Sequence, residues 1–446
     1  MNREILRLAW PNILSNISVP LLSTVDTALM GHLSALHLGA IGIGSMIFNF
    51  LYWNFGFLRM GTTGLTAQAY GAANRKEQLL TLARALLLAT GLALLLLLFQ
   101  KPLGRIGAEL MNSPPAHQPL IMRYFLIRIW AAPAALGLYV LSGWFFGMQN
   151  AKYPLYITLF VNSVNIALSW VLVKNFGWEV EGVAWGTVVA QYAGLALAML
   201  IWTLRYRPLF SESSGFRQMV LRPAKNLRIL LSDQQPFLHF LRINRDIFLR
   251  TLLLTSAFAI FYSRSAAIGA TILAVNTVLL QFLNWMSYGV DGFAFAAESV
   301  VGKYKGKKEP AKLQRAVRLS LFYGMALATA FALLYHFGGD ALIALFTSDP
   351  NVRQAAQPYL VWMALLPFFG APSYIWDGVF IGLTAARAMR NSMAAAFACF
   401  LLTLYLSPQL STDPNHSLWA AMLIFLGMRG LIQHLLYQSH KTLMEN

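Results

Sequence analysis

The chain has 446 residues, of which 57% are hydrophobic and only 11% are charged, and its mean hydropathy is +0.56. Soluble domains carry about 25% charged residues, and a soluble chain of this length cannot bury so much apolar surface. This composition excludes an ordinary soluble protein and indicates an integral membrane protein. The single cysteine, Cys399, excludes a disulfide framework and a cysteine-based metal site.

Apolar segments long enough to cross about 30 Å of hydrocarbon, which takes about 20 helical residues, recur along the whole chain. The twelve segments lie near residues 5–33, 40–70, 79–101, 120–148, 153–174, 182–204, 237–263, 270–301, 312–337, 354–383, 389–407 and 417–438. No small-residue cleavage site follows the first of them, so we expect it to stay in the mature protein. The sequence predicts an all-α integral membrane protein with twelve transmembrane helices.

The net charge of +17 is concentrated in short segments between these spans. The two largest basic clusters lie at 205–228 and 303–318, and smaller ones lie near Arg3, Arg75 and Arg387. Because they fall on every second connection, they follow the pattern of cytoplasmic loops, and we expect both termini in the cytoplasm. We expect no nucleic acid partner, since these side chains suit loop topology and anionic lipid headgroups.

The first span carries a carboxylate, Asp26, in the stretch STVDTALMGHL. A charged, unpaired carboxylate at membrane depth costs at least about 2.5 kcal/mol, so Asp26 must face other protein or a cavity. Pro11 and Pro20 give this helix places to bend, because proline removes a backbone hydrogen bond, and both gating and ordinary kinking remain open. Polar residues at spacings of three and four share a helix face with Asp26: Asn12, Asn16, Ser23 and Thr27.

The fifth and sixth spans offer polar partners for this face. Hydroxyls and amides there can accept a hydrogen bond from a protonated carboxyl, or ligate a small cation together with an ionised one. Hydrogen bonding between helices is the alternative role for small polar residues in membranes. The polar residues are Thr158, Asn162, Asn165 and Ser169 in the fifth span, and Thr187 and Gln191 in the sixth.

The eighth span carries two acids, Asp291 and Glu298, at a spacing of seven residues that returns to one helix face. Two roles remain open for them. They form a second proton relay, or they pair with Arg264 and the basic cluster that begins at Lys303.

Asp377 lies in the tenth span and is the third buried acid of the second half. The seventh span has no acid at its centre. Asp246 lies near its start beside Arg245 and Arg250, and a local ion pair explains it.

The longest connection, about residues 206–236, separates two halves that repeat one another. GTTGLTAQAYG at 61–71 matches GFAFAAESVVG at 292–302 at an offset of 231, and GWFFG at 143–147 matches GVFIG at 378–382 at an offset of 235. Each half holds an even number of spans, so the repeat is parallel, and two such lobes form a central cleft typical of transporters. The predicted parts are an N-terminal lobe at 1–205, a cytoplasmic basic linker at 206–236 and a C-terminal lobe at 237–446.

Sequence motifs throughout the chain point to one family. They are LAWPNILSN and VDTALMGHL in the first span, TTGLTAQAYGA in the second, EGVAWGTVVAQ in the sixth, IFLRTLLL in the seventh, YGVDGFAFAAESVVGKYKG in the eighth, and WDGVFIGLTAARAMRNSM across the tenth and eleventh. Together they resemble the multidrug and toxic compound extrusion (MATE) family, within its DNA-damage-inducible protein F branch. The resemblance implies the MATE fold of two six-helix lobes.

The same resemblance implies a cation site in the N-terminal lobe made of Asp26, Asn165 and Thr187. Where some members place a second Asp after that Asn, this chain has Ser169, and one fewer carboxylate favours a proton over Na⁺. Other branches couple to Na⁺ through C-terminal-lobe carboxylates, so Asp377 is a second candidate. Na⁺ at Asp26 or Asp377 remains an alternative, and no cofactor or other metal is implied.

We therefore expect a proton-coupled antiporter, not an enzyme, that works by alternating access in the bacterial inner membrane. Spans rich in aromatic residues and Met suit amphipathic or cationic organic compounds, and the resemblance implies export of drugs, dyes or bile-salt-like compounds. Two alternatives remain open: a Na⁺-coupled multidrug exporter, and a flippase for lipids or lipid-linked oligosaccharides. For the flippase, Arg59 and Arg264 are the main mid-span cations. The sequence does not predict the oligomeric state.

Overall fold

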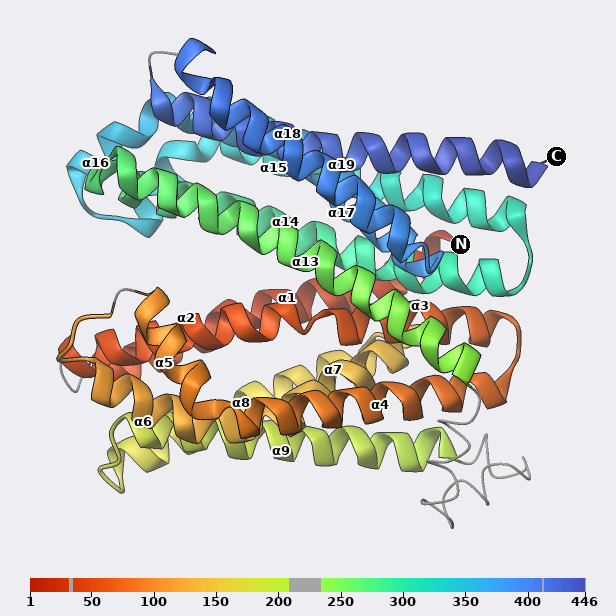
Figure 1. Cartoon of the computed structure of the whole chain (residues 1–446), viewed down its shortest axis with the longest axis horizontal. Helices are drawn as coiled ribbons and strands as arrows, with labels where there is room; N and C mark the ends of the chain where they lie inside the picture. Colours follow the sequence, from red (N-terminus) through yellow and green to blue (C-terminus); the bar gives the residue numbers. More distant parts are fainter. Residues whose placement is uncertain (32–34, 112, 208–233, 411–412, 446) are drawn as a thin grey trace. The chain divides into compact units, whose positions relative to one another are not determined.

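The computed structural model describes residues 1–31, 35–111, 113–207, 234–410 and 413–445, and for 19–31, 35, 234, 407–410 and 440–445 it describes the backbone alone. Every regular element in these ranges is a helix (Figure 1). Most of the predicted linker, 206–236, lies outside the described residues.

The helices of the first half follow the predicted spans in chain order. They are α1 (Asn2–Gly31), α2 (Ala35–Asn54), α3 (Phe57–Gly71), α4 (Arg75–Leu98), α5 (Gln100–Leu110), α6 (Gln118–Arg128), the short 3₁₀ helix η1 (Ile129–Ala131), α7 (Ala132–Gly147), α8 (Lys152–Lys174) and α9 (Val180–Arg205).

The second half repeats this succession of long helices. They are α13 (Gln234–Ile268), α14 (Ala270–Gly306), α15 (Pro310–Phe346), α16 (Pro350–Ala356), the 3₁₀ helix η2 (Gln357–Tyr359), α17 (Leu360–Gly382), α18 (Ala386–Leu410) and α19 (Pro414–Glu445).

The predicted spans are confirmed. Within the described residues, 11 helical segments are long and apolar enough to cross a membrane, and α1, with 30 residues, supplies the first span. Three spans are built from several helices in series: α2 to α3, α6 to α7 and α16 to α17. Prolines mark the last two junctions: Pro133 lies in the first turn of α7 and Pro358 lies in η2. Proline lacks a backbone N–H and fits the first turn of a helix best.

The chain forms two compact units. The N-terminal unit is Leu14–Arg242, and the C-terminal unit combines Met1–Ile13 with Ile243–Asn446. In the N-terminal unit α3 packs along α7 and α8 packs along α9. In the C-terminal unit α14 packs along α17 and α18 along α19, so the two units use the same order of helix pairs.

Closely packed glycines confirm the internal repeat. In the N-terminal unit a Cβ on Gly143 would overlap the carbonyl oxygen of Arg59. In the C-terminal unit a Cβ on Gly378 would overlap the carbonyl oxygen of Ala294. Arg59 corresponds to Ala294, and Gly143 corresponds to Gly378, at the same offset of 235 residues. The offset of 231 suggested by the glycine-rich motifs of the second and eighth spans is therefore one helical turn out of register.

Candidate functional site

Helices α8 and α9 bring together three of the residues proposed for coupling. Asn165 of α8 donates a hydrogen bond from Nδ2 to Oγ1 of Thr187 on α9, at 2.9 Å. Thr187 in turn donates to the carbonyl oxygen of Val183, at 3.0 Å. Ser169 lies one turn beyond Asn165, and both side chains are buried. The predicted meeting of the fifth and sixth spans is confirmed for these residues.

Two oxygen atoms of this cluster are available as hydrogen-bond acceptors. Among the residues that the structure describes, Asn165 Oδ1 and Ser169 Oγ are buried and have no hydrogen-bond partner. A Cβ on Gly186 of α9 would overlap Ser169 Oγ, so the absence of a side chain there lets α9 approach closely. Buried polar groups are usually paired, because leaving one unpaired costs about 1–3 kcal/mol. A protonated carboxyl group could donate to Asn165 Oδ1 and accept from the hydroxyl of Ser169, and a small cation could be bound by both oxygens.

Helix α1 contacts α8 through another member of the polar stripe. Asn162 donates from Nδ2 to the carbonyl oxygen and to Oγ of Ser18, each at 3.3 Å. Asp26 and Pro20 lie in the helical backbone of α1, and their side chains lie outside the described residues. The helix is continuous through Pro11 and Pro20.

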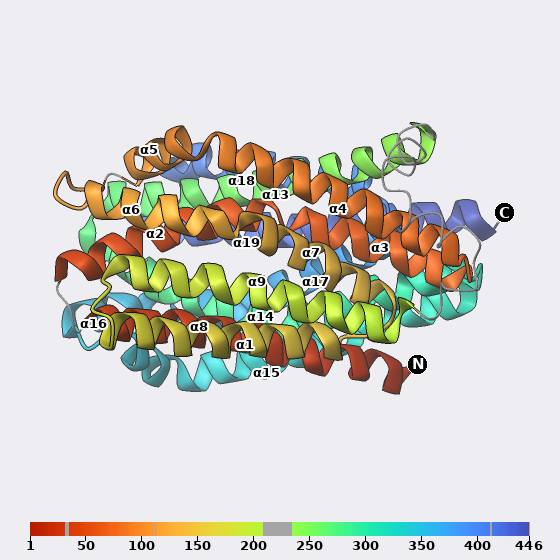
Figure 2. The ribbon, with the colours of Figure 1, turned by 90° about the horizontal axis from the view of Figure 1, so that it is seen from below.

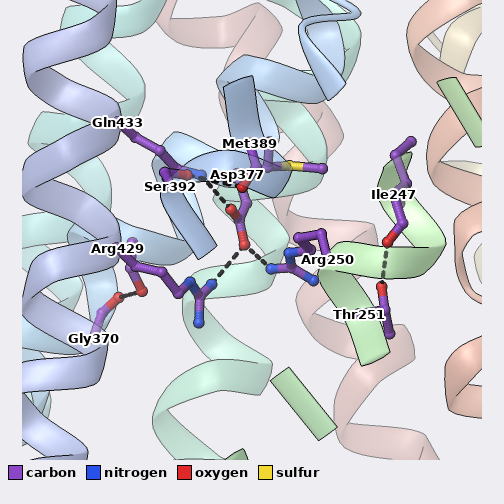
Figure 3. Close-up of polar contacts among 10 residues, drawn as sticks. Ile247, Arg250, Thr251, Gly370, Asp377, Met389, Ser392, Arg429 and Gln433 are labelled. Atoms are coloured by element: carbon purple, nitrogen blue, oxygen red, sulfur yellow. Dashed lines mark hydrogen bonds and ion pairs between the residues drawn. The ribbon is translucent and has the colours of Figure 1, made fainter. Parts of the chain in front are cut away.

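The C-terminal unit holds a second polar cluster, which is ionic (Figure 3). Asp377 of α17 accepts at Oδ2 from Arg250 of α13, and from Arg429 of α19 at 2.6 Å. Its other oxygen, Oδ1, accepts from Gln433 of α19 at 2.7 Å. All four side chains are buried. The guanidinium of Arg429 also lies over the ring of Tyr374, at 5.3 Å.

Charge complementarity in this cluster is strong. Two guanidinium groups converge on one carboxylate oxygen, and charge-assisted bonds of this kind are about twice as strong as neutral ones. Glu298 and Asp291 of α14 lie close enough for their charges to act on Arg250. Asp377 therefore has its negative charge balanced by the protein itself.

The predicted partners of Asp246 need correction. Asp246 pairs with Arg245 at 3.0 Å, as expected, but its second partner is Arg390 of α18, at 2.8 Å, and not Arg250. The side chain of Lys303 pairs with Glu4, at 2.5 Å. Sequence neighbours supply only one of these partners, Arg245, and the others, Arg390 and Glu4, come from helices far apart in the chain.

Arg429 and Gln433 were not among the residues selected from the sequence. Their signal is present in AAMLIFLGMRGLIQHLL, where one arginine interrupts an apolar run. Ionisable residues within a membrane span are rare and usually face protein. The view that Arg59 and Arg264 are the main mid-span cations is therefore incomplete, since Arg250 and Arg429 lie deeper in the protein.

Comparisons with known proteins identify the family. The MatE family model matches residues 11–171 and 247–408. The chain belongs to the MatE family. It is 38% identical over 440 residues to DNA damage-inducible protein F of Escherichia coli (strain K12), which covers 98% of this chain and 92% of that relative. It is 27% identical over 382 residues to a probable multidrug resistance protein NorM of Bradyrhizobium diazoefficiens, covering 84% and 78%.

Solved structures show the same fold. A MOP superfamily transporter from Pyrococcus furiosus matches with a TM-score of 0.83 at 17% identity, covering 100% of this chain and 96% of that one. A multidrug resistance MATE family transporter in an outward-facing conformation matches with a TM-score of 0.81 at 18% identity, covering 99% and 96%. This MatE family member is therefore a multi-pass membrane transporter and not an enzyme, and its family needs no cofactor.

Proposed function

We propose that this protein is a proton-coupled antiporter that exports amphipathic or cationic organic compounds across the bacterial inner membrane. Coupling takes place in the N-terminal unit, at Asp26 together with Asn165, Ser169 and Thr187. The observation that carries this proposal is the pair of buried acceptors, Asn165 Oδ1 and Ser169 Oγ, which have no partner in the described part of the chain. A protonated carboxyl group would supply the missing donor.

The backbone register supports Asp26 as the source of that donor. Ser18 of α1 contacts Asn162 of α8, and Figure 2 draws the two helices next to each other. Both helices belong to odd-numbered spans, so they cross the membrane in the same direction. Asp26 is eight residues beyond Ser18, and Ser169 is seven beyond Asn162. At a rise of 1.5 Å per residue these steps are about 12 and about 10.5 Å, which puts Asp26 and Ser169 at similar depth.

A proton is favoured over Na⁺ because the three partners are neutral. Asn165, Ser169 and Thr187 add no charge to the single carboxylate of Asp26. They can accept a hydrogen bond from its protonated form, which leaves no net charge to desolvate. The same oxygens can ligate Na⁺ together with an ionised Asp26, so Na⁺ coupling is the alternative that the experiment must distinguish.

One proton for each transport cycle supplies enough free energy. A charge that moves down a potential of about 100 mV releases about 2.3 kcal/mol, and a difference of one pH unit adds about 1.4 kcal/mol. Together these sustain a gradient of a few hundredfold for an uncharged substrate. Proton entry from the outside would neutralise Asp26 and change the packing of α1, with Pro11 and Pro20 as bending points.

The substrate class rests on relatives and on composition. Relatives at 22 to 27% identity are named probable multidrug resistance proteins. The chain contains 30 Phe, 12 Trp and 17 Met, and such side chains form adaptable apolar surfaces for large amphipathic molecules and organic cations. We propose drugs, dyes or bile-salt-like compounds as substrates, with the N- and C-termini of the transporter in the cytoplasm.

The test is efflux of a fluorescent cationic dye from proteoliposomes under an imposed proton gradient or an imposed Na⁺ gradient. We expect the proton gradient alone to drive efflux, and Asp26→Asn to abolish it. Asp340→Asn, which neutralises an exposed acid in α15, is the matched control and keeps full activity. Efflux that requires Na⁺, or that survives Asp26→Asn, overturns the assignment. No gradient-driven efflux at all supports the flippase alternative.

A further inference from the structure

A groove between the ends of α13 and α18 has no role in the transport mechanism proposed above. Its volume is about 420 Å³, which is within the usual range of small-molecule sites, about 300–1,000 Å³. Both walls belong to the C-terminal unit. It is lined by Ile260, Ser263 and Arg264 from α13 and by Leu401, Leu404 and Tyr405 from α18.

Arg264 is the one charged residue of this lining. It is exposed, and no acidic side chain in the described part of the chain forms an ion pair with it. The sequence LSPQLST at 406–412 contains no acid either. Arg264 therefore presents a positive charge beside an apolar wall.

Hydrogen bonds fix the end of α13 that carries Arg264. Asn276, which is fully buried, donates to Ser265 and to Asn415, each at 2.7 Å. It accepts a hydrogen bond from Trp419 Nε1 at 2.9 Å. These bonds join the end of α13 to the start of α14 and of α19, so Arg264 projects from a fixed backbone.

The position of Arg264 departs from the charge pattern of the rest of the chain. The basic residues of α13 and α18 gather at the opposite helix ends, at Arg245 and at Arg387 and Arg390. That charge distribution sets the orientation of spans, and Arg264 opposes it. The cation is thus not explained by topology, and a ligand that carries negative charge would explain it.

The surface around the groove is apolar and exposed. Tyr405 is 79% exposed, and Leu401 and Leu402 beside it are also exposed. Helix α18 needs about 20 residues to cross the hydrocarbon, so Tyr405, the 20th residue of the helix, lies at the interface where tyrosines are enriched. An occupant must combine an anionic polar part at Arg264 with an apolar part along Ile260, Leu401 and Leu404.

We propose that this groove binds one anionic phospholipid, from the non-cytoplasmic leaflet on the proposed orientation with both termini in the cytoplasm. The guanidinium of Arg264 would bind the phosphate, which arginine can contact through two N–H groups at once. The hydroxyls of Tyr405 and Ser263 are further donors at the same level, and an acyl chain lies along the leucines of α18. This site is separate from the coupling cluster of the N-terminal unit, so it does not depend on the ion that drives transport.

The test is native mass spectrometry of the full chain mixed with phosphatidylglycerol and phosphatidylcholine of identical acyl chains. We expect one phosphatidylglycerol to be retained per protein, and Arg264→Gln to weaken its binding by about tenfold or more, since a hydrogen bond to a charged group contributes about 1.5–3 kcal/mol. Arg105→Gln removes an exposed arginine from α5, near the same side of the membrane, and leaves binding unchanged.

A second variant tests the apolar wall. Leu401→Trp fills the groove without changing its charge, and we expect the same loss of phosphatidylglycerol. Retention of the lipid by both Arg264→Gln and Leu401→Trp overturns the proposal, as does equal loss in Arg105→Gln. Displacement of the bound lipid by equimolar deoxycholate would also overturn it, because the groove would then be a site for amphipathic anions in general.

Discussion

The two units differ most where their polar side chains meet. Between α8 and α9 the cluster is neutral, and two buried oxygens, on Asn165 and Ser169, have no partner in the part of the chain that the structure describes. Between α13, α17 and α19 the cluster is ionic, and both oxygens of Asp377 are occupied by Arg250, Arg429 and Gln433. The oxygens of the first cluster are available to accept a hydrogen bond or to ligate a cation, whereas the second cluster already contains its own cations.

This difference shows that a repeated backbone need not carry a repeated chemistry. Gly143 and Gly378 make equivalent close contacts in the two units at an offset of 235 residues. The side chains around these contacts nevertheless differ between the two units. In the C-terminal unit guanidinium groups balance the charge of Asp377, so no transported cation is needed to balance it. This contrast supports the proposal of coupling in the N-terminal unit, and we propose a positioning role for Asp377, which joins three helices.

The largest effect on stability is expected from breaking the ionic cluster. Arg429→Met removes one of two cations from Asp377 and leaves a buried carboxylate partly uncompensated. Removal of one partner from a buried ion pair costs about 3–5 kcal/mol, and we expect a loss of this size in the free energy of unfolding, followed by thermal denaturation in detergent.

Arg245→Gln is the control for this prediction, because it likewise removes one of the two cations that pair with an acid, but at an exposed position. The side chain of Arg245 is 61% exposed, and exposed pairs contribute about 1 kcal/mol or less. Equal destabilisation by Arg429→Met and Arg245→Gln would show that the buried cluster has no special role in holding the C-terminal unit together.

The next largest effect is expected at the paired glycines. Gly143→Ala and Gly378→Ala each add a methyl group against a carbonyl oxygen of the facing helix, and overpacking of this kind costs about 1–3 kcal/mol. We expect similar losses from the two substitutions in thermal denaturation. Gly91→Ala in α4, where nothing lies within 4 Å of the added Cβ, should be neutral or slightly stabilising. Unequal losses of stability from Gly143→Ala and Gly378→Ala would contradict the structural equivalence of the two units.

The spans and one cluster could be predicted from the sequence because each depends on local information. The length of an apolar segment follows from the thickness of the membrane, so predicted spans such as 153–174 and 182–204 agree closely with α8 and α9. The contact between Asn165 and Thr187 follows from two polar stripes on neighbouring spans.

The ionic cluster could not be predicted in the same way. Arg250 and Asp377 are 127 residues apart, and Asp246 and Arg390 are 144 apart. A sequence shows that each buried charge needs a partner. Which partner it meets depends on the orientation of α13, α17, α18 and α19 about their axes in the fold. Arg250 was therefore assigned to its neighbour Asp246, although its helix turns it toward Asp377.

A smaller effect is expected at Thr187, which both donates and accepts in the neutral cluster. Thr187→Val keeps the shape of the side chain and removes its hydroxyl, so the hydrogen bonds to Val183 and from Asn165 are lost. We expect a loss of about 1 kcal/mol in the free energy of unfolding and a decrease in proton-driven dye efflux. Thr329→Val, which removes a hydroxyl bonded only to Met325 within α15, is the control and should leave efflux unchanged.

The smallest effect on stability should accompany a clear effect on coupling. Ser169→Ala deletes a buried hydroxyl that has no partner among the described residues, so its removal relieves an unpaired polar group rather than breaking a bond. We expect the free energy of unfolding to change by about 0.5 kcal/mol or less, while proton-driven efflux falls because the carboxyl of Asp26 loses an acceptor. Ser320→Ala deletes an equally buried hydroxyl, also without a partner in the described ranges, from α15 of the C-terminal unit.

If both variants transport normally, the unpaired oxygen of Ser169 has no part in coupling and the contrast between the two clusters rests on Asn165 alone. If only Ser169→Ala impairs efflux, the protein keeps its stability but loses function at the neutral cluster. We expect this result if the Ser169 hydroxyl meets its proton donor only during transport.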